Sequence, residues 1–228
     1  RPVSLQMAML GLGGSVGTDE EGIEAETLVV RSFAELEAAG ERARDKIVVY
    51  NVAYESYGRT VQYRAAGASR AARLGARAVL LRSVGLPGLR TPHTGALSYT
   101  ERDPKIPAAA ISLEDAEMLQ RIQDRGQIAV VRLRMEAHFL EDAESANVIG
   151  ELRGREKPDE VVVVGGHLDS WDKGQGAHDD GAGCVQSIEA LHPEGPRPAE
   201  PLPRQWYNYV VLSDAYVECV PNREIMAR

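Results

Sequence analysis

Hydrophobic positions in the first part of the chain alternate between short apolar runs and longer amphipathic segments. The apolar runs predict five strands, at Met7–Leu12, Thr27–Val30, Lys46–Tyr50, Ala78–Leu81 and Ile128–Leu133. Each run has the length of an ordinary strand, and the segments between several of them are long enough for helices. Strands that alternate with helices are typical of an α/β domain. We therefore expect an α/β unit in the first part of the chain.

Capping signals mark the helices of this unit. Three are predicted, at Ser32–Arg44, Thr60–Leu74 and Ser112–Asp124. The first begins with a capping box, Ser32 followed by Glu35, and the second is closed by Gly75. The third has Ser112 as its N-cap and Gly126 just past its end.

A run of four valines, Val161–Val164, stands out in the second part of the chain. An uninterrupted apolar run predicts a strand buried on both faces, as in a parallel sheet covered by helices. Another strand is expected at Ala146–Gly150, with a turn at Gly154–Asp159 between the two. A helix is expected at Cys184–Leu191. Residues 193–203 carry five prolines, so we expect a loose linker there.

The loop after the valine run gathers residues that bind metals. His167 and Asp169 follow two glycines, and Asp179 and Asp180 come later in the same loop. Neutral imidazole is a good zinc ligand, and a carboxylate can bridge two cations. Alternation along an extended segment points His167 and Asp169 to the same side, so Asp169 can orient the imidazole. The pattern indicates a divalent-metal site, although a solvated glycine-rich turn would have a similar composition.

The net charge of the chain and the length of its apolar runs limit the kinds of partner that it can bind. The 228 residues carry a formal net charge of −8, which argues against nucleic acid or an anionic membrane as the main partner. No apolar run approaches the ~18–20 residues that span a bilayer. The chain opens with Arg1 rather than with Met and a signal core, so we expect a fragment or a processed form without a signal peptide. Cys184 and Cys219 either pair or remain two buried thiols.

Longer stretches of the sequence resemble the M28 family of zinc aminopeptidases. The stretch GGHLDSWDKGQGAHDDGAG, at residues 165–183, carries the resemblance together with NVIGELRGREKPDEVVVV before it. Upstream, LGLGGSVGT, KIVVYN, RTVQYRAAGA, TPHTG and KIPAAAISLEDAEML follow in the family's order and spacing. The resemblance extends from the N-terminal part of the chain to the helix expected after the metal loop.

The resemblance implies a site with two zinc ions. His167 would ligate one zinc, Asp179 would bridge both, and Asp169 would be the catalytic-site residue that supports His167. Asp214, in a segment that resembles a family strand ending in Ser-Asp-Ala, would bind the second zinc. The resemblance also implies a cis peptide bond between Asp179 and Asp180.

Two parts of the family's site have no counterpart in this sequence. In the family, a Glu-Glu pair supplies the general base and a zinc ligand, whereas this chain reads HPEGPRPAEPLPRQW after Leu191. The family's late His ligand also has no counterpart before Arg228. We therefore expect residues 1–228 to bind zinc weakly and to hydrolyse peptides poorly.

The resemblance implies a domain arrangement and a function. Residues 1–136 would form a protease-associated-like α/β domain with a flanking strand, 137–192 the start of a zinc-exopeptidase α/β sheet domain, and 193–228 a proline-rich linker and an atypical tail. The implied function is a secreted or lysosomal, homodimeric zinc exopeptidase that cleaves dipeptides or short peptides through a metal-activated water. The alternative is a catalytically incomplete fragment that acts as a protease-associated interaction module. A metal-free Rossmann-like module is weaker, because nothing in the sequence cradles a phosphate.

Overall fold

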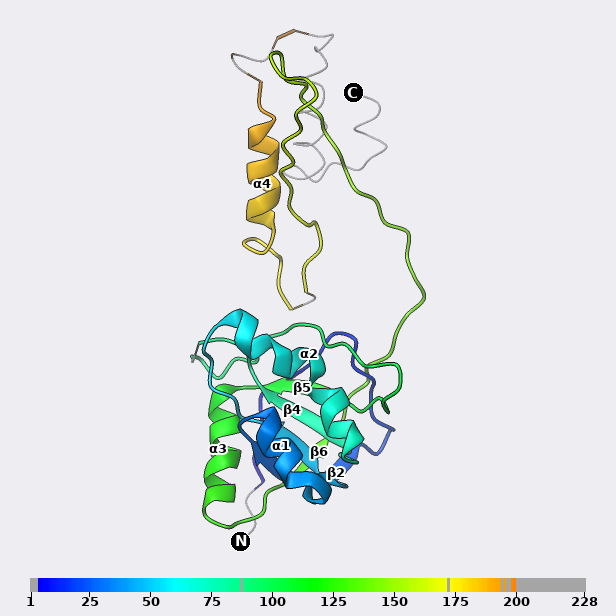
Figure 1. Ribbon diagram of the computed structural model, residues 1–228, viewed down its shortest axis with the longest axis vertical. Helices are drawn as coiled ribbons and strands as arrows, with labels where there is room; N and C mark the ends of the chain where they lie inside the picture. The colour runs from blue at the N-terminus through cyan, green and yellow to red at the C-terminus, as the bar shows by residue number, and fades with distance from the viewer. Residues whose placement is uncertain (1–3, 87, 172, 194, 196–197, 200–228) are drawn as a thin grey trace. The chain divides into compact units, whose positions relative to one another are not determined.

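The structure, a computed structural model, describes residues 4–86, 88–171, 173–193, 195 and 198–199 (Figure 1). The chain divides into two units between Glu141 and Asp142, a few residues after the predicted domain boundary. The linker and tail predicted for 193–228 lie almost entirely outside the described residues. No helix in the described part of the chain is long and apolar enough to span a bilayer.

The first unit is built on a six-stranded sheet in the order β1-β5-β4-β3-β2-β6 (Figure 1). Its strands are β1 (Met9–Gly11), β2 (Ile23–Val30), β3 (Ile47–Tyr50), β4 (Ala78–Arg82), β5 (Ala108–Ile111) and β6 (Val130–Leu133). The four central strands run parallel, and the edge strands β1 and β6 are antiparallel to their neighbours. The predicted α/β unit is therefore present, and each of its five predicted strands is found.

The sequence prediction missed β5, which lies between β4 and β1. Its three alanines favour helices and give no β-branched signal. All four of its residues are buried, and Ala109 and Ala110 belong to the cores on opposite faces of the sheet. This segment therefore forms a strand because it pairs with β1 and β4, which are distant from it in the sequence.

Helices cover both faces of the sheet. α1 (Phe33–Ala39) and α2 (Tyr57–Arg73) contribute to the core that contains Val48 and Tyr50 of β3. α3 (Leu113–Asp124) contributes to the opposite core, which contains Ile47 and Val49. Because successive side chains of a strand point to opposite faces, the apolar run of β3 fills both cores. A 3-10 turn, η1 (Gly40–Ala43), continues α1, so the predicted first helix changes type at this point.

The starts of α1 and α3 agree with the capping signals, whereas α2 begins at Tyr57, three residues before the predicted start. The Ser32 hydroxyl accepts the N–H of Glu35 at 3.0 Å, and the Ser112 hydroxyl accepts that of Asp115 at 3.1 Å. The Glu35 carboxylate in turn accepts the N–H of Arg31 at 2.7 Å, one residue before the N-cap. Side chains thereby satisfy N–H groups that have no partner within the helix.

The second unit differs from the prediction in its strands. Neither Val161–Val164 nor Ala146–Gly150 is a strand, and the four valines are between 56% and 88% exposed. The prediction of a buried strand and of a second sheet is therefore wrong for the described part of this unit. A central strand needs hydrogen-bonded neighbours and apolar cover. Residues 142–193 with their one gap supply a single regular element, α4 (Gly181–Ala190).

Candidate functional site

The loop that precedes α4 brings the ring of His167 close to two aspartates. Its Nε2 lies 2.9 Å from Oδ1 of Asp179. Its Nδ1 lies 2.9 Å from the backbone carbonyl oxygen of Asp169 and 3.3 Å from the Oδ1 of that residue. The peptide bond between Asp179 and Asp180 is cis, as expected. Three of the residues singled out in the sequence thus lie together in this loop.

Asp180 fixes the loop to α4. Its carboxylate caps the helix by accepting the N–H of Gly183 at 3.1 Å, and it also accepts the N–H of His167 at 3.3 Å. The chain approaches itself closely here, because a Cβ on Gly166 would lie 2.5 Å from the backbone nitrogen of Cys184. This capping role was not predicted, although Asp is a favoured N-cap residue and Gly-Ala-Gly follows it. Asp180 is therefore a residue that positions the loop.

The site is open to solvent. The side chain of His167 is 50% exposed, and those of Asp169 and Asp179 are 92% and 84% exposed. Ion pairs with such exposure are screened by water and stabilise the fold little. These contacts therefore orient the loop side chains more than they stabilise the unit, and both carboxylates can be reached by a cation from solution.

Both ring nitrogens of His167 face acceptor oxygens. The imidazole can donate from both nitrogens at once only when it is protonated. The hydrogen bond to the Asp169 carbonyl, and then the one to the Asp179 carboxylate, therefore raise the pKa of His167 above its ordinary value. A metal ion takes the place of a proton on imidazole, because the ligand is the neutral ring.

The donor set fits a zinc ion in part. Ligands at ~2.0–2.1 Å from a tetrahedral zinc lie about 3.3 Å apart, and His167 Nε2 and Asp179 Oδ1 are 2.9 Å apart. A catalytic zinc normally has three protein ligands and a water. Among the described residues, no group of three or more His, Cys, Asp and Glu side chains is placed to hold a metal. His167 and Asp179 are thus two candidate ligands of an incomplete set.

Two of the predicted residues cannot be placed. Asp214, the proposed ligand of a second zinc, lies outside the described residues together with the segment that contains it, and so does Cys219. Cys184 forms no disulfide within the described part of the chain, and its Sγ donates to the carbonyl oxygen of His167 at 3.3 Å.

Comparisons with known proteins show what this chain is similar to. The profile described as "Peptidase family M28" matches residues 147–195, which include the whole loop. Carboxypeptidase Q of Bos taurus is 53% identical over 186 residues, and that of Homo sapiens is 52% identical over 186 residues. Residues 147–195 of this chain therefore match peptidase family M28, and most of the chain is similar to carboxypeptidase Q and to a solved M28 peptidase.

The relatives are longer than this chain. Each carboxypeptidase Q match covers 82% of this chain and 39% of the relative. Among solved structures, an M28 peptidase precursor from Shewanella amazonensis aligns with a TM-score of 0.77 and 32% identity, over 96% of this chain and 54% of that chain. An aminopeptidase from Aneurinibacillus sp. strain AM-1 shares the fold, with a TM-score of 0.50 and 18% identity, over 95% of this chain and 51% of that chain.

Proposed function

We propose that this chain carries part of the site of a zinc-dependent metallo-exopeptidase that acts on dipeptides or short peptides. The observation that supports the proposal is the 2.9 Å approach of His167 Nε2 to Asp179 Oδ1, inside the segment that matches family M28. The name of the carboxypeptidase Q relatives supports exopeptidase chemistry. A homodimer and a secreted or lysosomal location belong to the same proposal and rest on the resemblance alone.

Each residue of the loop has a role in this proposal. His167 and Asp179 would hold zinc, which when bound polarises a carbonyl group and lowers the pKa of a bound water. Asp169 fixes the imidazole through its carbonyl oxygen at Nδ1, which leaves Nε2 directed at Asp179. Asp180 holds the start of the loop against α4 and thus sets the position of the histidine backbone.

Residues 1–228 alone should bind zinc weakly and hydrolyse peptides poorly. The described residues bring two candidate ligands together, and no Glu-Glu pair follows Asp179 in the sequence. General acid–base assistance is typically worth ~10²–10⁴-fold in rate. A chain without that base would therefore be slow even if zinc were bound. We propose further that the first unit is the protease-associated-like part of such an enzyme.

Zinc binding and turnover should be measured together on the purified 228-residue chain. Competition with a chromogenic chelator gives the zinc affinity, and a panel of dipeptides gives the activity. Asp179→Asn removes the charge of one ligand with little change in size. Asp159→Asn is the matched control, because Asp159 is in the same unit with its side chain 98% exposed. We expect zinc affinity to fall at least about tenfold in Asp179→Asn and to be unchanged in the control.

The outcomes separate the alternatives. Equal zinc binding by the three proteins would exclude Asp179 as a ligand and favour the interaction-module alternative. Rapid turnover that is lost only in Asp179→Asn would contradict the expectation of poor activity, because other residues would then complete the site.

A further inference from the structure

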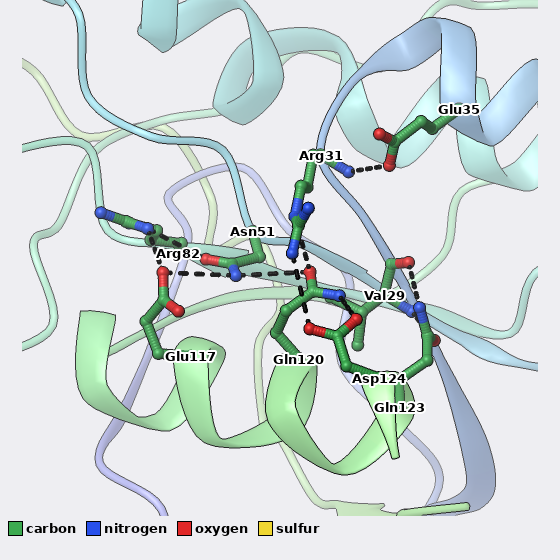
Figure 2. Close-up of polar contacts among 9 residues, drawn as sticks. All are labelled: Val29, Arg31, Glu35, Asn51, Arg82, Glu117, Gln120, Gln123 and Asp124. Carbon is green, nitrogen blue, oxygen red and sulfur yellow. Dashed lines mark hydrogen bonds and ion pairs between the residues drawn. The ribbon is translucent and has the colours of Figure 1, made fainter. Parts of the chain in front are cut away.

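A second polar site lies in the first unit, at the carboxyl ends of three neighbouring parallel strands (Figure 2). Arg31 follows β2, Asn51 follows β3, and Arg82 is the last residue of β4. In open α/β sheets, ligands bind outside this edge of the sheet. The site lies within the first unit and contains none of the residues of the metal loop, so it does not depend on the proposed exopeptidase function.

α3 supplies polar side chains beneath this edge (Figure 2). Glu117 and Gln120 are three residues apart and so lie on the same side of the helix. The Glu117 carboxylate accepts from Arg82 Nη1 at 2.7 Å, and the Gln120 carbonyl accepts from Arg31 Nε at 3.3 Å. Asn51, which is 4% exposed, accepts from Arg82 Nη1 at 3.1 Å. These contacts hold two guanidinium groups in defined positions.

A cavity of about 320 Å³ opens at this edge. It is lined by Arg31, Asn51, Val52, Ala53, Glu55, Arg82 and Glu117. Its volume is at the lower end of the ~300–1,000 Å³ that is usual for small-molecule sites. It therefore suits a ligand of a few heavy atoms.

Arg82 has unused hydrogen-bonding capacity. Its side chain is 13% exposed, and both hydrogen bonds that it makes within the described residues use Nη1. Its Nε is buried and has no acceptor in that part of the chain. A ligand in the cavity cannot reach this buried nitrogen, so the remaining Nη2 is the atom through which Arg82 can donate to it.

The charges around the cavity have both signs. Arg31 and Arg82 are positive, whereas Glu55 and Glu117 are negative. A ligand with a single charge would be attracted by one pair and repelled by the other. A ligand with a carboxylate and an ammonium group can satisfy both pairs.

We propose that this cavity binds a small zwitterion, a free amino acid or a dipeptide. The guanidinium groups of Arg31 and Arg82 receive the carboxylate, since a planar fork of N–H donors matches its two oxygens. Glu117 receives the ammonium group. Asn51 positions these groups, because its Oδ1 accepts from Arg82 and its Nδ2 donates to Glu117 and Gln120 at 3.5 Å.

The probes for the test are L-alanine, dialanine, N-acetyl-L-alanine and L-alaninamide. The first two carry both charges, the third lacks the ammonium group, and the fourth lacks the carboxylate. Binding to the full chain is followed by NMR, through the side-chain amide signals of Asn51 and Gln120. We expect saturable millimolar binding of at least one zwitterion, and binding at least about tenfold weaker for the two blocked compounds.

Two variants connect binding to the named residues. Arg31→Gln should weaken binding of the zwitterion at least fivefold, or about 1 kcal/mol by the relation between affinity and free energy. Arg44→Gln is its matched control, because the side chains of Arg31 and Arg44 are 57% and 58% exposed and Arg44 lies in another part of the unit. Glu117→Gln keeps an acceptor for Arg82 but removes the charge, so it should abolish the preference for L-alanine over N-acetyl-L-alanine.

Three results would overturn the proposal. These are the absence of saturable shifts with either zwitterion, equal binding of all four compounds, and equal loss of binding in Arg31→Gln and Arg44→Gln. Thermal unfolding of each variant verifies that it is folded, and Arg82 is left unchanged because it is largely buried.

Discussion

The two units of this chain use similar apolar segments in different ways. β3 reads IVVY and the run at Val161–Val164 reads VVVV. Every residue of β3 is 0% exposed, whereas the four valines are between 56% and 88% exposed. β3 pairs with β2 and β4 and has helices on both faces, while the valine run pairs with no strand in the described part of the chain. An apolar run can therefore form a buried strand, but it does so only where other strands pair with it and helices cover it.

Hydrogen exchange on the intact chain should show the largest difference between the two segments. Amides of Ile47–Tyr50 should exchange only when the first unit unfolds, which for a stability of at least ~5 kcal/mol slows exchange by about 10³-fold or more. Amides of Val161–Val164 should exchange at nearly unprotected rates. Mass spectrometry of peptides from the labelled chain measures both. Comparable protection of the two segments would mean that the valine run pairs in solution.

The sequence predicted the elements of the first unit wherever the signal was local. The capping serines and the β-branched runs are examples, because each depends on residues close to one another in the chain. β5 was missed because its burial comes from pairing with β1 and β4, which local propensity does not record. The valine run was predicted as a strand for the opposite reason, since its local signal is strong and its neighbours are absent from the described residues.

The same distinction applies to the candidate sites. The proximity of His167 and Asp179 could be expected because both residues belong to one loop, and the family resemblance pointed to that loop. The cluster of Arg31, Asn51 and Arg82 could not be expected, because its members come from three strands that are adjacent only in the folded sheet. Sites within a loop are therefore more visible in the sequence than sites assembled across a sheet.

A glycine in α2 tests how tightly the first unit is packed. A Cβ on Gly67 would lie 2.7 Å from Cε2 of Tyr50, whose hydroxyl donates to the Gly67 carbonyl at 2.9 Å. Tyr50 is fully buried and packs edge-to-face on Phe33, so it has little room to move. Gly67→Ala should lower the free energy of unfolding by ~1–3 kcal/mol through overpacking. Urea denaturation followed by circular dichroism measures this change.

Gly58→Ala in the same helix is the matched control. Apart from the adjoining residues and the backbone of the helix itself, no atom lies within 4 Å of the Cβ position at Gly58. The substitution should therefore be neutral or should stabilise by up to ~1 kcal/mol, the ordinary helix preference for alanine. If both variants had the same stability, the contact between α2 and Tyr50 would not be tight, and the difference in packing between the two units would be smaller than the structure indicates.

The smallest effect should be seen in the titration of His167, in the second unit. The Asp169 carbonyl and then the Asp179 carboxylate raise the pKa of His167. Asp179→Asn should therefore lower this pKa, but not fully to the ordinary value of ~6.5, because the stronger contribution from the Asp169 carbonyl remains. NMR of the imidazole ring protons as a function of pH measures the change, with Asp159→Asn as the control.

The sign of the associated stability follows from linkage. Because the pKa of His167 is higher in the folded chain than in the unfolded chain, protonation stabilises the loop. That contribution is fully present below the unfolded pKa and is lost as the pH rises through the folded pKa. It should be much smaller than the effect of Gly67→Ala, because the His167 side chain is half exposed and its contacts are screened by water. An identical titration in Asp179→Asn and in the unaltered chain would mean that the 2.9 Å contact does not form in solution. The described part of the second unit would then have neither an ordered metal loop nor a sheet, and its contrast with the first unit would be greater than the structure shows.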